Sequence, residues 1–280
     1  MNSQFITHRF AVTLRTFSIF AFVSSNIAFS QVTKSEYYEV MQQIHEIYYP
    51  IAKLHGRSFV VRDEWSSNSK GAGSYHEGDD YFKIYVSGGL ARYRGMTKDA
   101  LSKVMCHEAG HIFGGFPFSS VDVVGWLSAE PNPDYYAGQV CLRSLWKHQT
   151  EENLRFISQG GKTVAQRCKA AWGNLAERAL CHRIAVAALV DLSALAEIEG
   201  WPIPSYDVST TENDINCRLQ TNLAGATCTV EFDMSIIPGF HFSFEERNSL
   251  AAEKIALDQS CYVEEIGARP SCWFNQRIGQ

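Results

Sequence analysis

The sequence predicts an α+β protein with a small mixed sheet in its first half and a mainly helical second half. Apolar and polar residues alternate strictly over residues 81–87, which is typical of a half-buried strand. A helical pattern follows over 97–113, and it begins at Thr97, a favourable N-cap residue. Alanine and leucine then dominate 150–199, which favours consecutive helices.

The composition is that of a folded protein with a sizeable core. Of the 280 residues, 45% are hydrophobic, and 25 basic against 30 acidic residues give a net charge of −5. The length favours one large domain. Nucleic-acid binding is not expected, because its affinity depends on clustered lysines and arginines and the chain has no basic run.

Residues 1–30 have the pattern of a secretory signal peptide. Arg9 and Arg15 stand in a stretch without acids, and an apolar run of about 13 residues ends in Ala-Phe-Ser. This run is shorter than the roughly 20 residues that span a membrane, so we expect cleavage before Gln31. The mature protein should therefore be exported, to a periplasm or out of the cell, with no stretch long and apolar enough to span a membrane.

All eight cysteines follow the expected cleavage site, which favours disulfides in an oxidising compartment. Their spacing suggests pairing between nearest neighbours along the chain. The expected pairs are Cys168 with Cys181, Cys217 with Cys228 and Cys261 with Cys272, which leaves Cys106 with Cys141.

The remaining elements follow from periodicity and from turn residues. We expect a helix that ends near Pro50, and we expect Gly114-Gly115 to end the helix that Thr97 begins. A turn at Gly173-Asn174 would bring Cys168 and Cys181 together. In order, the expected elements are a helix over 35–54, a strand over 58–61, a loop over 65–78, the strand over 81–87, and helices over 97–113, 130–146 and within 150–199.

The clearest chemical signal is His-Glu-Ala-Gly-His at residues 107–111. Residues four apart share one face of a helix, so His107 and His111 can bind one tetrahedral Zn²⁺. Glu108 is placed to act as a general base on a zinc-activated water rather than as a ligand. Chance would produce this pattern roughly 0.02 times in such a chain; the alternative is two surface histidines on an amphipathic helix.

A catalytic zinc needs a third protein ligand. The metzincin pattern is excluded because Pro117 occupies its histidine position. Glu130 and Asp134, one helical turn apart, are the carboxylate candidates. Cys106 is a rival ligand, but neighbouring helical residues point about 100° apart, so a Cys106–Cys141 disulfide between the two ligand-bearing helices is favoured.

Through the HExxH motif and the later Glu130-x-x-x-Asp134 pair, residues 80–146 resemble the gluzincins, the zincin metallopeptidases that include thermolysin. The resemblance implies a zincin-like core with an active-site helix. It implies Glu130 as the third ligand and Asp134 as an outer carboxylate that accepts the N–H of a ligand histidine. The chain departs from the family pattern at Pro131 and Pro133, which fit if Glu130 is the N-cap.

Two further expectations follow from zincins. The strand over 81–87 would be the sheet edge to which a substrate peptide adds, an ordinary interior strand being the equal alternative. Ser209-Thr210-Thr211 followed by Arg218 is faintly similar to a motif of prenyl-protease-type zincins, although Thr211 and Glu212 replace its His-Pro, and this places Arg218 near the site. The candidate oxyanion-stabilising donors are Arg218, Tyr135, Tyr136, Tyr206 and His241.

The sequence thus predicts an exported zinc metallopeptidase, a hydrolase that acts on protein or peptide substrates with one Zn²⁺. Residues 31–150 would form the zincin-like catalytic core, and 151–280 the helical, disulfide-stapled part of the same domain. Two alternatives remain: a non-peptidase zinc amide hydrolase that acts on cell-envelope material, and a non-catalytic, disulfide-rich binding domain with structural zinc.

Overall fold

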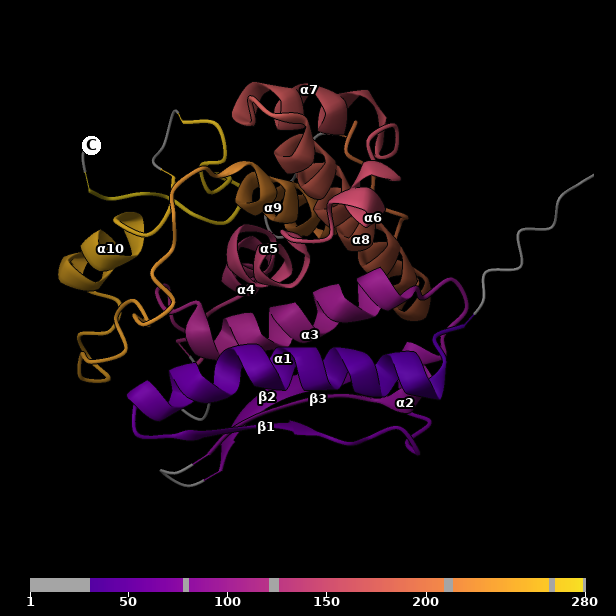
Figure 1. Cartoon of the computed structure of the whole chain (residues 1–280). Coiled ribbons are helices and arrows are strands. Elements are labelled where there is room, and N and C mark those ends of the chain that lie inside the picture. The colour runs from indigo at the N-terminus through magenta and orange to yellow at the C-terminus, as the bar shows by residue number, and fades with distance from the viewer. Residues whose placement is uncertain (1–30, 78–80, 121–125, 209–213, 262–264, 279–280) are drawn as a thin grey trace, which may run out of the picture.

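A small sheet and two long helices form one side of the molecule, and most of the other helices, including the longest, stack above them (Figure 1). The computed structural model describes residues 31–77, 81–120, 126–208, 214–261 and 265–278. The expected signal peptide, 1–30, lies outside the described residues. The predicted α+β class is confirmed. In chain order, the elements are α1 Lys34–Leu54, β1 Ser58–Arg62, β2 Ala72–Glu77, β3 Tyr81–Val86, α2 Gly88–Ala91, α3 Lys98–Phe113, α4 Asn132–Tyr136, the π-helix η2 Ala137–Cys141, α5 Leu142–Trp146, α6 Thr150–Leu154, α7 Gly161–Ala171, α8 Leu175–Glu199, α9 Ile215–Thr227 and α10 Leu250–Leu257.

The sheet is mixed, and β3 lies at its centre. It pairs in parallel with β1, where Ser58 lies opposite Tyr81, and antiparallel with β2, where Ser74 lies opposite Ile84. The prediction that residues 81–87 form an edge strand was therefore wrong, and the interior alternative is right. The edge next to α3 is β2, which lies inside the stretch predicted as a loop. Its Gly- and Ser-containing sequence has little strand propensity, so pairing with β3 determines its conformation.

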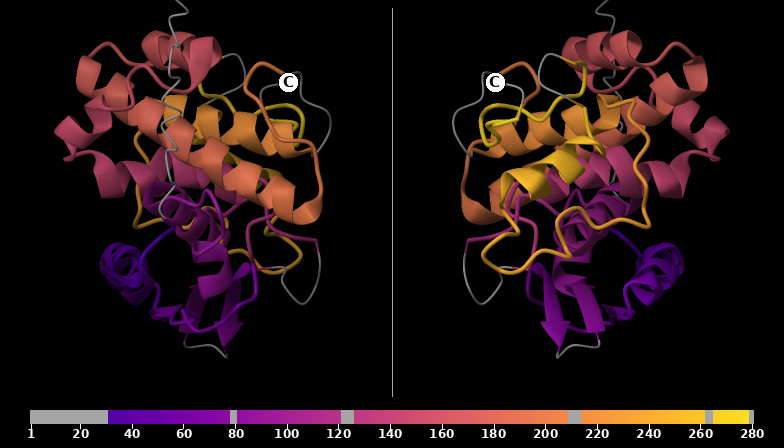
Figure 2. Two further views of the ribbon diagram at one scale, coloured as in Figure 1. Left: turned by 90° about the vertical axis from the view of Figure 1, so that its right-hand side faces the viewer. Right: turned by 90° about the vertical axis from the view of Figure 1, so that its left-hand side faces the viewer.

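Helices α1 and α3 cover one face of this sheet (Figures 1 and 2). A capping box of Thr33 and Glu36 begins α1. The helical pattern over 35–54 was expected to break near Pro50, but the helix continues to Leu54, where the pattern ends. Burial explains the difference: Ile51, beyond the proline, still packs into the core and offsets the lost backbone hydrogen bond.

The predicted boundaries of α3 are confirmed. The Thr97 side chain accepts the N–H of Ala100 at 3.1 Å, and the helix ends at Phe113 before Gly114. Nearly the whole helix is buried, because it lies between the sheet below and α4 and α8 above. Its position at the centre of the molecule fixes the histidines that it carries.

The helix predicted over 130–146 is divided into α4, η2 and α5. Its N-cap is Pro131, so the prediction that Glu130 caps the helix was wrong by one residue. The Pro131 carbonyl accepts the N–H of Asp134 at 2.9 Å, which starts the helical hydrogen bonding one residue later. Glu130 therefore stands in the loop that leads into α4. The later helices α7 and α8 turn at Asn174 as predicted; its side chain accepts the N–H of Glu177.

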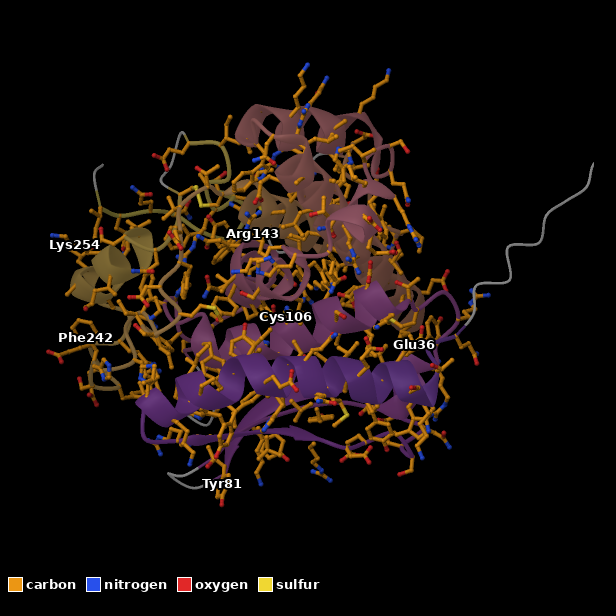
Figure 3. The ribbon with its side chains drawn as sticks, viewed as in Figure 1. Glu36, Tyr81, Cys106, Arg143, Phe242 and Lys254 are labelled. Carbon is orange, nitrogen blue, oxygen red and sulfur yellow. A yellow bond between two sulfur atoms is a disulfide. The ribbon has the colours of Figure 1, made fainter. Side chains whose placement is uncertain are left out.

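The described chain has four disulfides and no free cysteine. The predicted pairs Cys106–Cys141 and Cys168–Cys181 are confirmed, and the first links α3 to η2 (Figure 3). The other two predicted pairs were wrong: the bonds are Cys217–Cys272 and Cys228–Cys261. Cys217 and Cys228 lie at opposite ends of α9, about 16 Å apart by helical rise, and a disulfide requires Cα atoms within about 7 Å. Four disulfides agree with an oxidising compartment.

Helix α8 corrects another expectation. By length and composition it could cross a membrane, although no stretch after residue 30 was expected to qualify. Within its most apolar window, however, 72% is buried inside the protein. Helix α8 thus has the environment of a core helix, packed against α3, α6 and α9.

Candidate metal centre

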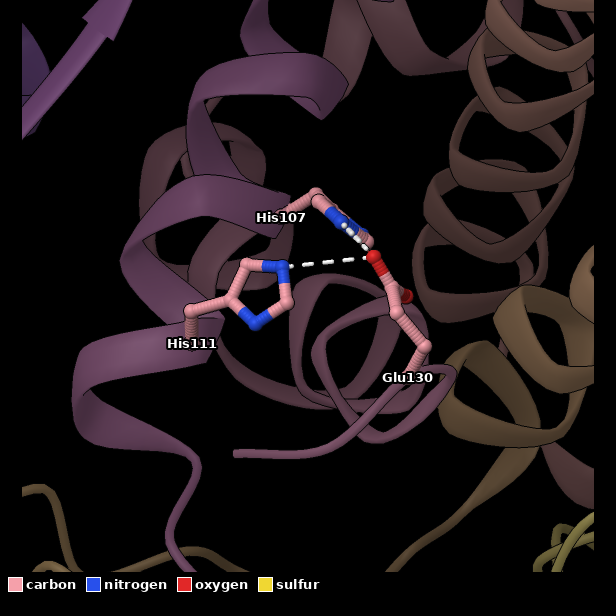
Figure 4. Close-up of side chains that lie close together, drawn as sticks. All are labelled: His107, His111 and Glu130. Carbon is pink, nitrogen blue, oxygen red and sulfur yellow. Dashed lines mark hydrogen bonds and ion pairs between the residues drawn. The ribbon is translucent and has the colours of Figure 1, made fainter. Parts of the chain in front are cut away.

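Two histidines of α3 and the carboxylate of Glu130 converge on one point (Figure 4). The Nε2 atoms of His107 and His111 lie 3.1 Å and 3.3 Å from the same oxygen, Oε1 of Glu130. The imidazole rings are 4.8 Å apart between centroids and nearly perpendicular. One ligand atom from each residue lies within 4.8 Å of the others, so the group could hold a metal ion. Asp134, the other candidate for the third ligand, instead contacts Nδ1 of His107, on the opposite side of the ring from Glu130.

The other nitrogen of each ring is held by an oxygen from outside the group. His107 Nδ1 lies 2.8 Å from Oδ1 of Asp134, and His111 Nδ1 lies 2.8 Å from the carbonyl oxygen of Ser128. With Nδ1–H donated to these oxygens, each ring turns Nε2 towards Glu130. Asp134 thus has the outer position that the gluzincin resemblance implies.

The charge of Glu130 and Asp134 controls the protonation of His107. Burial alone would lower the pKa of His107, but the two carboxylates outweigh it and raise the pKa to about 9. Without a cation, His107 is therefore protonated at neutral pH and donates to Glu130. A bound cation would take the place of that proton.

Asp134 is the centre of a buried charge network. It has no exposed surface, and it accepts from Lys103 Nζ at 2.8 Å and from Arg218 Nε at 2.6 Å, besides His107. Burial alone would raise the pKa of Asp134, but Arg218, Lys103 and His107 hold it well below its ordinary value. The carboxylate is thus charged at any physiological pH. Lys103 also pairs with Asp191 of α8 at 2.7 Å.

Sequence analysis missed two members of this network. Lys103 precedes His107 by one helical turn on the same face of α3, which is a signal that could have identified it. Asp191 is one of four acidic residues in the long helix α8, and nothing local indicates its partner.

Arg218 lies beside the metal group, as expected. Its Nη2 is 3.6 Å from Oε2 of Glu130, and its side chain remains 20% exposed. Residues 209–211, the other part of that weak similarity, lie outside the described residues. The remaining oxyanion candidates lie elsewhere. Tyr135 and Tyr206 donate to the carbonyls of Gly267 and Ala185. Tyr136 is in the core, and the ring of His241 lies 5.8 Å from that of His55 between centroids.

Glu108 is held by a residue of the sheet. The hydroxyl of Ser74, on β2, lies 2.7 Å from Oε2 of Glu108 and 2.6 Å from its backbone carbonyl. The hydroxyl hydrogen can reach either oxygen. Glu108 is only 7% exposed. Sequence analysis missed Ser74 because it belongs to the stretch predicted as a loop.

A cavity of about 290 Å³ opens onto the metal group. Gly71 and Ala72, at the start of β2, form one side, and Leu195 and Glu199 of α8 form another. Between them the cavity reaches the side chains of Lys103, Val104, His107, Glu108, Glu130, Asp191 and Arg218. The arrangement brings a carboxylate, a guanidinium and a potential metal site into one space that a ligand can enter.

Comparison with known proteins found no match for this chain, whether among family models, curated proteins or solved structures.

Proposed function

We propose that this protein is a zinc-dependent peptide hydrolase in which His107, His111 and Glu130 hold the metal. One observation carries the proposal: both Nε2 atoms point at the same carboxylate oxygen, at 3.1 Å and 3.3 Å. Two ligand atoms that are each about 2.05 Å from a tetrahedral zinc ion lie about 3.3 Å from each other. The spacing of these side chains therefore suits a zinc ion with two imidazoles and one carboxylate.

The neighbouring groups suit hydrolysis. Zinc, when bound, acts as a Lewis acid that makes a water nucleophilic at neutral pH. Glu108 would take the proton of the attacking water and pass it to the leaving amine. Ser74 would orient the Glu108 carboxylate through its hydrogen bond. Arg218 lines the cavity next to Glu130 and could stabilise the developing oxyanion, while Asp134 keeps it in position.

An open cavity favours catalysis over a structural role. Structural zinc sites have four protein ligands and are closed. Here the described residues supply three ligands, and the cavity of about 290 Å³ reaches His107, Glu108 and Glu130. A substrate could therefore approach the metal and the general base together.

An extended peptide suits the border of this cavity. The edge strand β2 begins at the cavity, and its Ser74 side chain contacts Glu108. One edge of β2 pairs with β3, and no other strand of the described sheet pairs with the opposite edge. A peptide can add to such an edge by main-chain hydrogen bonds. This favours a peptide over other amide substrates, including cell-envelope material.

Metal analysis and one substitution test the proposal. We expect the purified mature protein to bind one zinc ion per chain, and His111→Ala to lose it. Glu108→Gln should keep the zinc but lower kcat for casein peptides by at least about 100-fold. Glu152→Gln, which removes a surface carboxylate paired with Arg155, is the matched control and should change neither.

Three results would contradict the proposal in different ways. A wild-type chain that binds no zinc would refute the metal site. Zinc binding without hydrolysis of any peptide would favour the binding-domain alternative. Digestion of cell-wall material but not of casein peptides would favour the other amide hydrolase.

A further inference from the structure

Another cavity, of about 160 Å³, lies next to the sheet and is lined by five aromatic side chains together with Gly239 and Arg247. We call it the aromatic pocket and define it by Phe118, Trp126, Phe240, Phe242 and Phe244. The first two belong to the connection between α3 and α4. The other three belong to the segment that leads to α10, on which Figure 3 labels Phe242.

Hydrogen bonds between the two segments hold the pocket in shape. Phe118 donates its N–H to Asn248 Oδ1 at 2.8 Å, and Asn248 Nδ2 donates to the Phe118 carbonyl at 3.0 Å. Arg247 Nη2 donates to the carbonyl of Ser119, also at 3.0 Å. Phe116 and Pro238 add a backbone hydrogen bond of 2.8 Å. The cavity therefore exists before any ligand binds, which lowers the cost of binding.

The aromatic pocket is connected to the metal centre through β2. The rings of Trp126 and His76 are 4.7 Å apart between centroids. His76 follows Ser74 by two residues, so both side chains lie on the same face of β2, and Ser74 contacts Glu108. Two residues of a strand span about 7 Å. The pocket thus lies two or three residues along β2 from the general base.

The direction of β2 identifies the part of a substrate that would reach the pocket. The strand begins at the metal-centre cavity, at Ala72, and runs towards His76. A peptide that adds antiparallel to β2 runs the opposite way. The residues that it places near His76 and Trp126 therefore precede the bond that lies opposite Ser74 and Glu108.

We propose that the aromatic pocket binds a phenylalanine side chain at the second or third residue before the cleaved bond, which makes it a specificity pocket. This inference rests on the proposed peptide hydrolysis. The volume supports a single ring, because a cavity of about 150 Å³ accommodates benzene. A mainly aromatic wall favours another aromatic ring over an aliphatic side chain.

Matched peptides test the pocket. Cleavage sites in casein peptides identify a cleaved bond, and two synthetic peptides then carry Phe or Ala at the second or third position before it. We expect the wild-type protein to prefer the Phe peptide by at least about tenfold in kcat/KM. In Phe244→Asp and in Phe242→Ala the preference should fall below about threefold. Ile236→Ala, an exposed apolar residue of the same segment that does not line the pocket, should keep the full preference.

A binding measurement separates this inference from the proposed function. The same two peptides are titrated calorimetrically into zinc-loaded Glu108→Gln, with and without Phe244→Asp. If the wild type cleaves no peptide, two extended peptides that differ only in one central Phe or Ala take their place. Tighter binding of the Phe peptide that Phe244→Asp abolishes supports the pocket even if the wild type hydrolyses nothing. Equal affinities, or a preference unchanged in both pocket variants, would overturn it, even if peptide hydrolysis itself is demonstrated.

Discussion

Ser74 lies on the edge strand β2 and Glu108 on helix α3, and a 2.7 Å hydrogen bond joins their side chains. This hydrogen bond fixes the rotamer of Glu108, which the backbone of α3 alone would leave free. It also brings β2 to the metal centre, because Gly71 and Ala72 line the same cavity. The edge strand is therefore part of the site.

Ser74→Ala should lower kcat for a peptide substrate by about 10- to 100-fold while zinc content and KM change little. The hydroxyl touches Glu108 and none of the three candidate ligands, so its loss frees the carboxylate without disturbing His107, His111 and Glu130. Steady-state kinetics with metal analysis provides the measurement. Ser67→Ala, which removes an exposed hydroxyl bonded to Ser69, is the control. An unchanged kcat in Ser74→Ala would show that Glu108 does not need this contact.

Asp134→Asn should destabilise the protein by about 3 kcal/mol, because it removes the buried charge that Lys103 and Arg218 share. Zinc affinity should fall by about 10- to 100-fold, since His107 loses a charged acceptor. Urea unfolding and zinc titration measure the two effects. Lys98→Met, which breaks the partly exposed pair with Glu39, should cost less than about 1 kcal/mol. Comparable losses in both variants would argue against the special role of the buried network.

Gly225→Ala should lower the free energy of unfolding by at least about 2 kcal/mol. A Cβ at Gly225 of α9 would lie 2.2 Å from the backbone oxygen of Tyr135 in α4, which cannot move without shifting the helix next to Glu130. Gly173→Ala is the control, because its Cβ would meet nothing within 4 Å, and it should change stability by less than about 0.5 kcal/mol. Thermal and urea unfolding compare the two, and equal stability would mean that α4 and α9 can separate enough to admit a methyl group.

Proteolysis without reduction should release peptides that link Cys217 to Cys272 and Cys228 to Cys261, which mass spectrometry identifies. Peptides linking Cys217 to Cys228 would contradict the fold of α9.

The disulfides should also differ in their contribution to stability. The Cys217–Cys272 bridge closes a sequence separation of 55 residues and the Cys168–Cys181 bridge one of 13. On the chain-entropy account, replacing the first pair by serines should cost about 4 kcal/mol and replacing the second about 3 kcal/mol. Urea unfolding of the two double variants checks the order, and a reversed order would show that native contacts outweigh loop length.

Local pattern was sufficient for much of the site. The cap at Thr97 and the spacing of His107 and His111 depend on helical geometry alone, which fixes the relation between residues four apart. A spacing motif identified Glu130 and Asp134 as candidates. In the structure, Glu130 contacts Nε2 of His107 and Asp134 contacts Nδ1 of the same ring. The pairing of Cys168 with Cys181 required only a turn between two helices.

Only the tertiary structure reveals contacts between residues that are distant in sequence. Nothing near Ser74 indicates that it meets Glu108, and nothing near Asp191 indicates Lys103, because β2 forms only by pairing with β3 and α8 reaches α3 only by packing. The same reason made the last two disulfides unpredictable, since a rigid α9 separates two cysteines that are neighbours along the chain. Short-range steric and hydrogen-bonding rules act within a few residues, whereas burial joins surfaces irrespective of their order in the sequence.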